Sequence, residues 1–418
     1  MFEKVLIANR GEIALRVIRS CRERGLRTVA VHSEIDADAL HTRLADEAIC
    51  IGPADPMRSY LHIPAIIAAA EITGADAVHP GYGFLSENPE FAETCAQCGL
   101  EFIGPLPDQM RQWGDKVSAR ALAKSLGLPT IEGTELIEDI DDAVKKAEAL
   151  GFPLLLKASR GGGGRGMHIL QSKEELRAIF GTARAESRVA FGNDALYFEK
   201  YIDRPRHIEF QVLGDKHGNV HVLGERECSI QRRQRAMGEA GYLSAGTLEF
   251  LLDDRGELTF LEMNPRIQVE HPVTELVMGI DLVDEQIRIA DGKRLELPEH
   301  LAPRGHAIEC RINAEDPDTF APSPGRITEL HMAGGTGVRI DSGVYGGGLV
   351  PSHYDPLIAK LIVHAPTRAQ AIAKMRRALS ETLIGGIVTN IPLHQRILEH
   401  PAFEEGRFST HFLDELQA

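Results

Sequence analysis

A glycine-rich loop between two short apolar segments sets the strongest limit on how this chain can fold. Phe152–Lys157 is typical of a strand that ends in a lysine, Gly161–Gly166 supplies five glycines, and Met167 begins a second apolar segment. Glycines let consecutive backbone N–H groups turn toward an anion, and the lysine can reach a phosphate as a point charge. A flexible linker is the alternative, but strands directly on both sides argue against it. The G-x-x-x-x-G-K-[ST] spacing of a P-loop is absent.

The first hundred residues alternate apolar strands with amphipathic helices. A helix is expected over Gly11–Arg24, and strands at Lys4–Ala8, Arg27–His32, Ala75–Val78 and Glu101–Ile103. This β-α-β rhythm predicts a doubly wound parallel sheet with helices on both faces. Asn9-Arg10-Gly11-Glu12 follows the first strand in place of G-x-G-x-x-G, which argues against a dinucleotide site.

The middle of the chain has a different pattern. Period-2 alternation and Asp/Gly turns predict an antiparallel sheet, with strands at His207–Leu213, Val220–Glu225, Thr247–Leu252 and Glu257–Met263. Helices are expected near Asp115–Ser125 and over Arg368–Leu383. The chain therefore combines α/β and α+β units. We expect four domains, spanning 1–113, 114–201, 202–330 and 331–418.

Two expected strands of this sheet carry oxygen ligands. Glu262 and Asn264 are two apart and share a face, and Glu249 in the neighbouring strand could face them. Two carboxylates and an amide in apolar strands are unfavourable to bury unless a cation compensates. Hard oxygen ligands suit Mg²⁺ or Mn²⁺, which also hold nucleotide phosphates. A polar row that faces solvent is the alternative.

Directly after this strand come Arg266, Gln268 and Glu270, again two apart. They offer a bidentate fork for an anion, an amide and a carboxylate base along one edge. A plain ion-paired edge strand would show the same pattern. The loop His79–Asn88, with its glycines and proline after a strand, could be a ligand contact or a structural turn.

The charge balance excludes some partners. A net charge of −15 argues against general binding of nucleic acid or of an anionic membrane. The N-terminal apolar run is too short for a signal peptide, and no stretch approaches a membrane span. Six cysteines without regular spacing fit a reducing compartment, so we expect a cytoplasmic protein. Cys95 and Cys98 form a lone C-x-x-C, more typical of a structural helix than of a zinc or redox site.

With these residues in view, the chain resembles the biotin carboxylase family of the ATP-grasp superfamily nearly from end to end. The matching motifs, in order, are Ile7–Ala14, His79–Asn88, Gly114–Lys116, Gly161–Gly166, Pro205–Glu209, Glu225–Arg233, Glu262–Thr274, Glu309–Asp316 and Pro322–Gly325. The resemblance implies a pre-ATP-grasp domain, an ATP-grasp lid, an ATP-grasp core and a C-terminal domain. It also implies a ligase that uses ATP to carboxylate biotin with bicarbonate through carboxyphosphate, as the first half-reaction of an enzyme such as acetyl-CoA carboxylase in fatty acid biosynthesis.

The resemblance further assigns roles to single residues. Contacts to ATP phosphates are implied for Lys116, Lys157, Gly163 and Gly164. Other nucleotide contacts are implied for Glu199, Lys200, Tyr201, Ile202, His207 and Gln231. Divalent metal ions, Mg²⁺ or Mn²⁺, would be held by Glu249, Glu262 and Asn264. Bicarbonate would be bound by Arg266, Gln268 and Val269, with Glu270 as its base and Arg339 stabilising the biotin enolate.

The chain departs from the family after Arg233. The family normally continues with His-Gln-Lys, a pair of Glu residues and a Pro-rich loop before a helix, whereas here Gln234–Ala240 leads at once to Gly241. The family's His and its bicarbonate-side Lys have no counterpart, and Arg235 is not given that role. The stretch could be naturally short, removed, or missing from the printed sequence.

The resemblance also implies partners. Lys374 lies in an amphipathic helix without the Glu-Ala-Met pattern of a biotin attachment site, so biotin would arrive on a separate carrier protein or domain. A carboxyltransferase subunit and a homodimer, with Arg16 at its interface, are expected. Two other hypotheses remain open: an ATP-grasp ligase that joins another acid to an amine, and an inactive nucleotide-binding variant.

Overall fold

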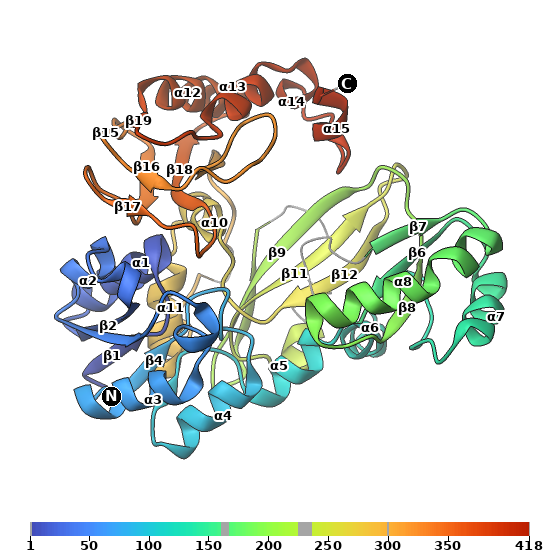
Figure 1. Ribbon diagram of the computed structural model, residues 1–418, viewed down its shortest axis with the longest axis horizontal. Coiled ribbons are helices and arrows are strands. Elements are labelled where there is room, and N and C mark those ends of the chain that lie inside the picture. The colour runs from blue at the N-terminus through green and yellow to red at the C-terminus, as the bar shows by residue number, and fades with distance from the viewer. Residues whose placement is uncertain (1, 160–166, 225–235, 299–300, 418) are drawn as a thin grey trace.

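The computed structural model describes residues 2–159, 167–224, 236–298 and 301–417 (Figure 1). The predicted N-terminal sheet is confirmed: its strands are all parallel, in the order β3-β2-β1-β4-β5. The strands are β1 Lys4–Ile7, β2 Arg27–Ser33, β3 Glu47–Gly52, β4 Ala77–His79 and β5 Glu101–Phe102. The helices of this unit are α1 Gly11–Glu23, α2 Leu40–Leu44, α3 Ile63–Thr73 and α4 Pro89–Gln97, with short 3₁₀ turns at Glu34–Asp36 and Pro56–Arg58.

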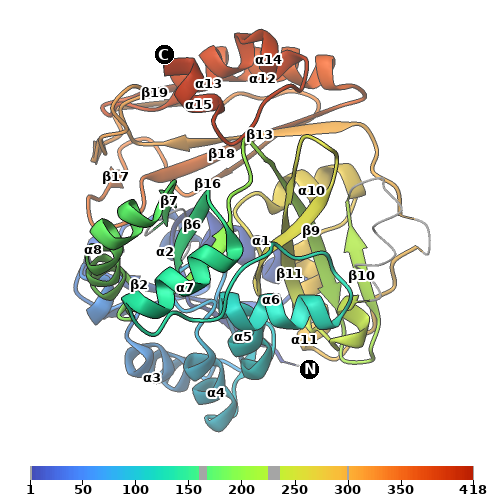
Figure 2. The same ribbon diagram turned by 90° about the vertical axis from the view of Figure 1, so that its right-hand side faces the viewer.

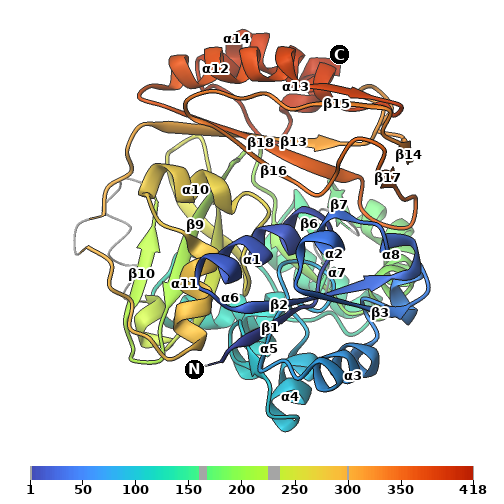
Figure 3. The ribbon, with the colours of Figure 1, turned by 90° about the vertical axis from the view of Figure 1, so that its left-hand side faces the viewer.

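Strand β1 shows why this sheet is covered on both faces. Val5 and Ile7 pack into a core with α1, whereas Leu6 and Ala8 pack into a second core with α3 and α4. Neighbouring residues of a strand point to opposite faces, so a continuous apolar run predicts burial on both sides. Figure 3 shows α1 lying across the strands of this unit.

The second unit projects from the body on the right of Figure 1. Strands β6 Leu154–Ala158, β7 Met167–Leu170 and β8 Leu196–Lys200 form an antiparallel sheet in the order β7-β6-β8. Helices α7 Ile140–Leu150 and α8 Lys173–Phe191 pack on it, and Figure 2 shows both on this side of the molecule. Asp139 and Ser172 cap these helices by accepting hydrogen bonds from backbone N–H groups in the first turn. The strands predicted on either side of the glycine loop are thus confirmed.

The central unit carries the predicted antiparallel sheet, in the order β10-β9-β11-β12. Its strands are β9 Arg206–Gly214, β10 Val220–Leu223, β11 Ser244–Leu252 and β12 Leu258–Asn264. Its helices are α5 Pro107–Gly114, α6 Lys116–Ser125, α10 His271–Met278 and α11 Leu282–Ala290. Three edge-to-face phenylalanines, Phe210, Phe250 and Phe260, fill the core under α6.

The C-terminal unit is a sheet in the order β13-β18-β16, with α12 packed on it. Only the helix was expected from the sequence. The boundary predicted at 330 falls after β13, yet β13 pairs with β18 beyond it, so we begin this unit at β13. Its elements are β13 His306–Asn313, β14 Gly325–Arg326, β15 Glu329–His331, β16 Val338–Ser342, β17 Leu349–Val350, β18 Leu357–Ala365, α12 Arg368–Glu381, β19 Leu383–Gly385, α13 Ile391–Glu399, α14 Pro401–Glu404 and α15 Phe412–Gln417.

The cysteines in the described part of the chain are free thiols. Cys95 is buried in α4, and burial raises the pKa of its thiol to about 12. A thiol that stays protonated is a poor nucleophile and metal ligand, which favours the structural interpretation of the Cys95–Cys98 pair. Among the helices described, none is both long and apolar enough to cross a membrane.

Candidate active site

The three predicted metal ligands meet on strands β11 and β12. Glu249 lies directly opposite Glu262 in the pairing of these strands, next to a bulge between Glu249 and Phe250. The Asn264 side-chain amide donates a hydrogen bond to Glu249 Oε1. The three residues therefore form one cluster of oxygen ligands on the sheet rather than a scattered polar row.

Lys116 brings a positive charge to this cluster. Its Nζ lies 2.9 Å from Glu262 Oε2, and its side chain is mostly buried. Lys116 is the first residue of α6, and Asp115 caps that helix by accepting a hydrogen bond from Ser118 N at 2.9 Å. The cap fixes where the helix begins and hence where the lysine emerges.

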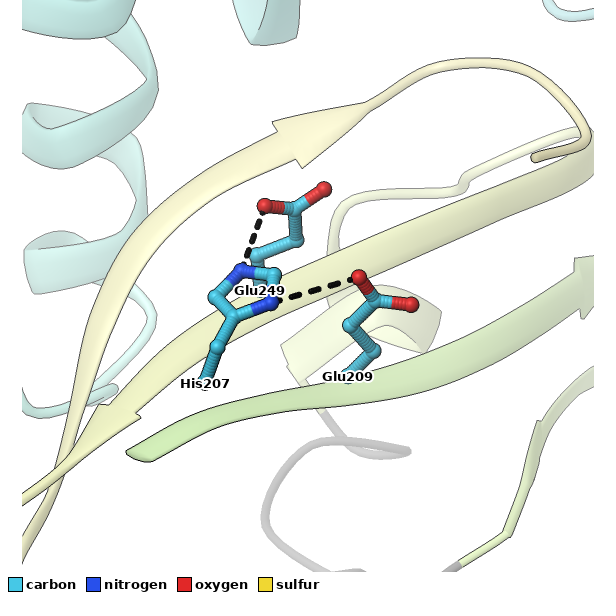
Figure 4. A group of neighbouring side chains, drawn as sticks. All are labelled: His207, Glu209 and Glu249. Carbon is cyan, nitrogen blue, oxygen red and sulfur yellow. Dashed lines mark hydrogen bonds and ion pairs between the residues drawn. The ribbon is translucent and has the colours of Figure 1, made fainter. Parts of the chain in front are cut away.

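His207 lies between the carboxylates of Glu249 and Glu209 (Figure 4). Its Nε2 lies 2.8 Å from Glu249 Oε2, and its Nδ1 lies 3.4 Å from Glu209 Oε1. The hydrogen bond that His207 donates to the Glu249 carboxylate raises the pKa of His207. Burial, together with Glu270 and Glu249, raises the pKa of Glu209 to about 8. Glu209 was not predicted as a site residue, although it faces Glu249 directly in the strand pairing.

The residues predicted to bind bicarbonate follow β12 and join the same cluster. Gln268 Nε2 donates to Glu249 Oε1 at 2.7 Å, and Gln268 is buried. Arg266 donates to Asn264 Oδ1 at 3.2 Å and, through Nε, to Glu87 Oε1 at 2.5 Å. Glu87 belongs to the loop His79–Asn88, so that loop does reach the site.

The predicted base, Glu270, is paired with an arginine that the sequence analysis did not single out. Arg311 Nη2 donates to Glu270 Oε2 at 2.6 Å. Glu270 precedes α10, and Arg311 comes from β13 of the C-terminal unit. The sequence held one signal, because Arg311 lies within the motif Glu309–Asp316.

Arg339 occupies a different position from the one expected. Its guanidinium donates to Glu275 Oε2 at 2.6 Å and to both carboxylate oxygens of Asp341, at 3.1 and 2.8 Å. Arg16, expected at a subunit interface, is 6% exposed within the single chain and donates to Glu275 and Asp281. Both arginines are thus held by carboxylates inside the chain, and neither contact involves Glu270 or the Glu249 cluster.

Lys157 lies in β6 of the second unit and is buried. Lys157 Nζ lies 2.8 Å from Glu199 Oε2, and Tyr197 donates to the other oxygen of Glu199 at 3.0 Å. Lys200 turns its ammonium to the backbone oxygens of Leu150 and Gly151, at 3.2 and 2.8 Å. Tyr201 and Ile202 follow β8 and are half-buried. The expected contacts Gly163, Gly164 and Gln231 lie outside the described residues.

A cavity of about 550 Å³ opens beside Arg266 and Arg311. Its wall combines charged groups with apolar and aromatic ones from the N-terminal, central and C-terminal units. Lining residues include Tyr82, Phe84, Arg266, Val269, Arg311 and Tyr354. A wall that combines apolar and aromatic surface with charged groups can bury an organic ligand and also fix the orientation of its polar atoms.

The stretch that departs from the family, Gln234–Ala240, begins at the end of residues 225–235, which lie outside the described part of the chain. From Ala236 onward the chain is firmly packed, with Met237 and Tyr242 fully buried. Gln109 holds this segment by donating to Gly241 O at 2.7 Å and accepting from Leu243 N at 3.2 Å.

Comparison with protein families identifies each unit. The biotin carboxylase N-terminal domain matches residues 1–110, and the biotin carboxylase C-terminal domain matches residues 309–415. The ATP-binding domain of the carbamoyl-phosphate synthase L chain matches residues 115–240 and 234–298. These two segments meet at the stretch where the sequence departs from the family pattern.

Individual relatives agree over the whole length. The biotin carboxylase of Haemophilus influenzae is 53% identical and covers 99% of this chain and 98% of its own. The biotin carboxylase domain of Hydrogenobacter thermophilus 2-oxoglutarate carboxylase, solved as a dimer with MgADP, ADP and bicarbonate, is 46% identical with a TM-score of 0.96, and covers 99% of this chain and 98% of its own. A Campylobacter jejuni biotin carboxylase bound to an ATP analogue is 43% identical, also with a TM-score of 0.96, and covers 99% of both chains.

The alignment with the Haemophilus relative also shows that this chain is the shorter over the matched length. It runs over 442 positions, whereas this chain has 418 residues, so at least 24 positions of the relative have no counterpart here.

Proposed function

The chain belongs to the biotin carboxylase family, and we propose that it carboxylates biotin with bicarbonate and ATP through the cluster around Glu249. One observation carries the assignment of residues. Glu249 accepts hydrogen bonds both from Asn264, a proposed metal ligand, and from Gln268, a proposed bicarbonate-binding residue. A phosphoryl group held by the first set would therefore lie beside an anion held by the second, as phosphorylation of bicarbonate requires.

The oxygen ligands fit Mg²⁺ or Mn²⁺. Glu249, Glu262 and Asn264 offer two carboxylates and an amide oxygen on paired strands, which is the donor set that hard divalent cations prefer. When bound, such an ion neutralises phosphate charge during phosphoryl transfer. Lys116 now pairs with Glu262 and would be free to contact a phosphate once the carboxylate has another partner.

Arg266, Gln268 and Glu270 would handle bicarbonate. The guanidinium of Arg266 supplies a fork that matches a planar anion, and Gln268 adds a buried amide. Glu270 would accept the bicarbonate proton, after Arg311 releases its carboxylate. Attack by a bicarbonate oxygen on the γ-phosphorus of ATP would then break the bond from that phosphorus to the bridging oxygen, release ADP and form carboxyphosphate. Burial and lid closure protect such an intermediate from water.

Biotin would enter the cavity beside Arg311. We assign the enolate-stabilising role to Arg311 and no longer to Arg339, because Arg311 lines the cavity and contacts Glu270. A guanidinium that can donate to a developing oxyanion lowers the barrier to its formation. Arg339 is already held by two carboxylates elsewhere.

The partners follow from the same reaction. We propose that biotin arrives on a carrier protein or domain, because Lys374 donates to the backbone oxygens of Thr336 and His364 and is engaged in the fold. A carboxyltransferase would use the carboxybiotin, with acetyl-CoA as the proposed acceptor. A homodimer is supported by the dimer of the Hydrogenobacter relative, and a cytoplasmic location by the free thiols.

The test is ATP cleavage by the intact chain, with bicarbonate and with or without free biotin. Cleavage should require bicarbonate and rise with biotin. Activity indifferent to both would contradict the assignment, and activity with an amine acceptor in place of biotin would favour another ATP-grasp ligase. The shortened stretch after Arg233 favours one competing function, a nucleotide-binding variant without turnover. Calorimetric binding of ATP with no product under any condition would support that alternative.

A further inference from the structure

Lys360 is a lysine with no solvent exposure that is absent from the roles assigned so far. It lies in β18, and its ammonium donates to the backbone oxygen of Val269 at 2.9 Å. Glu12 Oε1 lies 3.1 Å from the same nitrogen, and Asp341 Oδ2 lies at 3.8 Å. Burying an ammonium is unfavourable unless it is paired and hydrogen-bonded, and here two carboxylates and a carbonyl surround it.

These contacts join three units at one atom. Glu12 comes from α1 of the N-terminal unit, and Val269 comes from the segment between β12 and α10. Lys360 and Asp341 come from β18 and β16 of the C-terminal unit. The two carboxylates fix the ammonium, so the ammonium in turn provides a fixed point for the Val269 carbonyl.

The held carbonyl belongs to the site. Val269 stands between Gln268, which bonds Glu249, and Glu270, which bonds Arg311. A peptide group is planar, so fixing the Val269 carbonyl also fixes the N–H of Glu270 and the direction in which that residue leaves the chain. The base is therefore oriented partly from the C-terminal unit.

The same ion pair reaches the cavity wall. Glu12 accepts a hydrogen bond from the hydroxyl of Tyr82, and Tyr82 lines the cavity of about 550 Å³. Lys360 thus connects the base segment on one side to the wall of the proposed biotin pocket on the other. No comparable link from Lys360 to Lys116, Glu262 or the lid exists in the described part of the chain.

We propose that Lys360 is a positioning residue for the bicarbonate and biotin half of the site, holding the Val269–Glu270 peptide in register with Arg266 and Arg311. The inference rests on the proposed function. It assigns Lys360 to one half-site only: the nucleotide half is built on β11, β12 and α6 and does not depend on it.

The test compares Lys360→Met with Lys374→Met. Both remove a lysine of the C-terminal unit that donates to backbone carbonyls, but Lys374 contacts Thr336 and His364 instead of the base segment. Lys360→Met should raise the KM for bicarbonate, or lower kcat, by about tenfold or more, as expected for loss of a hydrogen bond to a charged group. ATP affinity measured by calorimetry should stay within about twofold. Lys374→Met should change neither.

Two further variants keep the proposal testable if Lys360→Met does not fold. Lys360→Arg can still donate to Val269 O, so its KM for bicarbonate should return most of the way to the wild-type value. Glu12→Gln keeps the lysine but removes its charged partner, and should raise the KM for bicarbonate while leaving ATP affinity unchanged. Equal loss of ATP and bicarbonate binding in Glu12→Gln, or a Lys360→Met variant in which both the KM for bicarbonate and kcat are unchanged, would overturn the proposal. Wild-type cleavage that needs neither bicarbonate nor biotin would instead refute the proposed function itself.

Discussion

At the scale of single residues, the site depends on which arginine faces the base. Arg311 contacts Glu270, whereas Arg339 is bound to Glu275 and Asp341. Arg311→Gln should lower the rate of biotin carboxylation about a hundredfold, as for removal of an oxyanion donor, while ATP still binds. Arg339→Gln should lower the melting temperature, because it removes one charged partner from each of two buried carboxylates, Glu275 and Asp341, yet retain the KM for biotin. The reverse pattern in the two variants would contradict the assignment.

A second residue-scale prediction concerns Glu309, which lies two positions before Arg311. Neither of its carboxylate oxygens has a hydrogen-bond partner among the described residues. Burial raises the pKa of Glu309 to about 8. The charges of Lys360 and Arg311 lower this pKa, whereas those of Glu270 and Glu12 raise it further. Because the pKa of Glu309 in the folded chain lies above the ordinary value of 4.5, its contribution to the free energy of unfolding is complete below pH 4.5. It is lost as the pH rises through about 8.

Thermal melts of Glu309→Gln can measure this loss. Glutamine cannot ionise, so the variant should lose less stability than the wild type between pH 6 and pH 9. At pH 9 we expect its melting temperature to be higher by about 2 °C or more. Parallel melting curves for the two proteins across this range would show that Glu309 does not titrate there.

Much of the site could be predicted at this scale. Spacing by two placed Glu262 with Asn264 on one face of β12, because side-chain direction in a strand follows from position alone. The rule does not explain the placement of Arg266, Gln268 and Glu270, because β12 ends at Asn264 and these three residues lie outside any strand. The same rule could not choose between Arg311 and Arg339. Both lie in strands that the sequence pattern did not predict, β13 and β16, and which of them meets Glu270 depends on how the C-terminal unit docks against α10.

At the scale of elements, helix α6 connects local sequence to the nucleotide site. Asp115 caps the helix and so places Lys116 beside Glu262. Asp115→Ala should reduce stability by about 1 kcal/mol and also raise the KM for ATP. Thr367, which caps α12 through Gln370 N, provides a matched control. Thr367→Ala should reduce stability by a similar amount and leave the KM for ATP unchanged. An unchanged KM for ATP in Asp115→Ala would show that the Asp115 cap does not position Lys116 for ATP binding.

The elements themselves were predictable where pattern and period agreed. The parallel strands β1 and β2 and the antiparallel strands β9, β11 and β12 lie close to their expected positions. Strands β13, β16 and β18 were not expected. They carry buried or half-buried charged residues such as Lys360 and Asp341, which break the apolar alternation that marks a strand. Those charges are paired only after the units come together.

At the scale of the whole molecule, the site exists only where the units meet. The central unit supplies Glu249 and Glu270, the N-terminal unit supplies Glu87, and the C-terminal unit supplies Arg311 and Lys360. Contacts between segments hundreds of residues apart cannot be predicted from local periodicity. The family resemblance, which the comparisons confirm, assigned roles to Glu249 and Glu270 but none to Glu87, Arg311 or Lys360.

The shortened stretch after Arg233 makes the reaction itself the central claim to test. The described residues include Lys116, Lys157, the cluster around Glu249 and the cavity beside Arg311, so we expect this chain to remain a biotin carboxylase. The most direct measurement follows labelled carbon from bicarbonate into biotin, with ATP and Mg²⁺ present, for the wild type and for Glu270→Gln. The account predicts carboxybiotin with the wild type and at least about a hundredfold less with the variant. ATP binding without any labelled carboxybiotin from the wild type would contradict it.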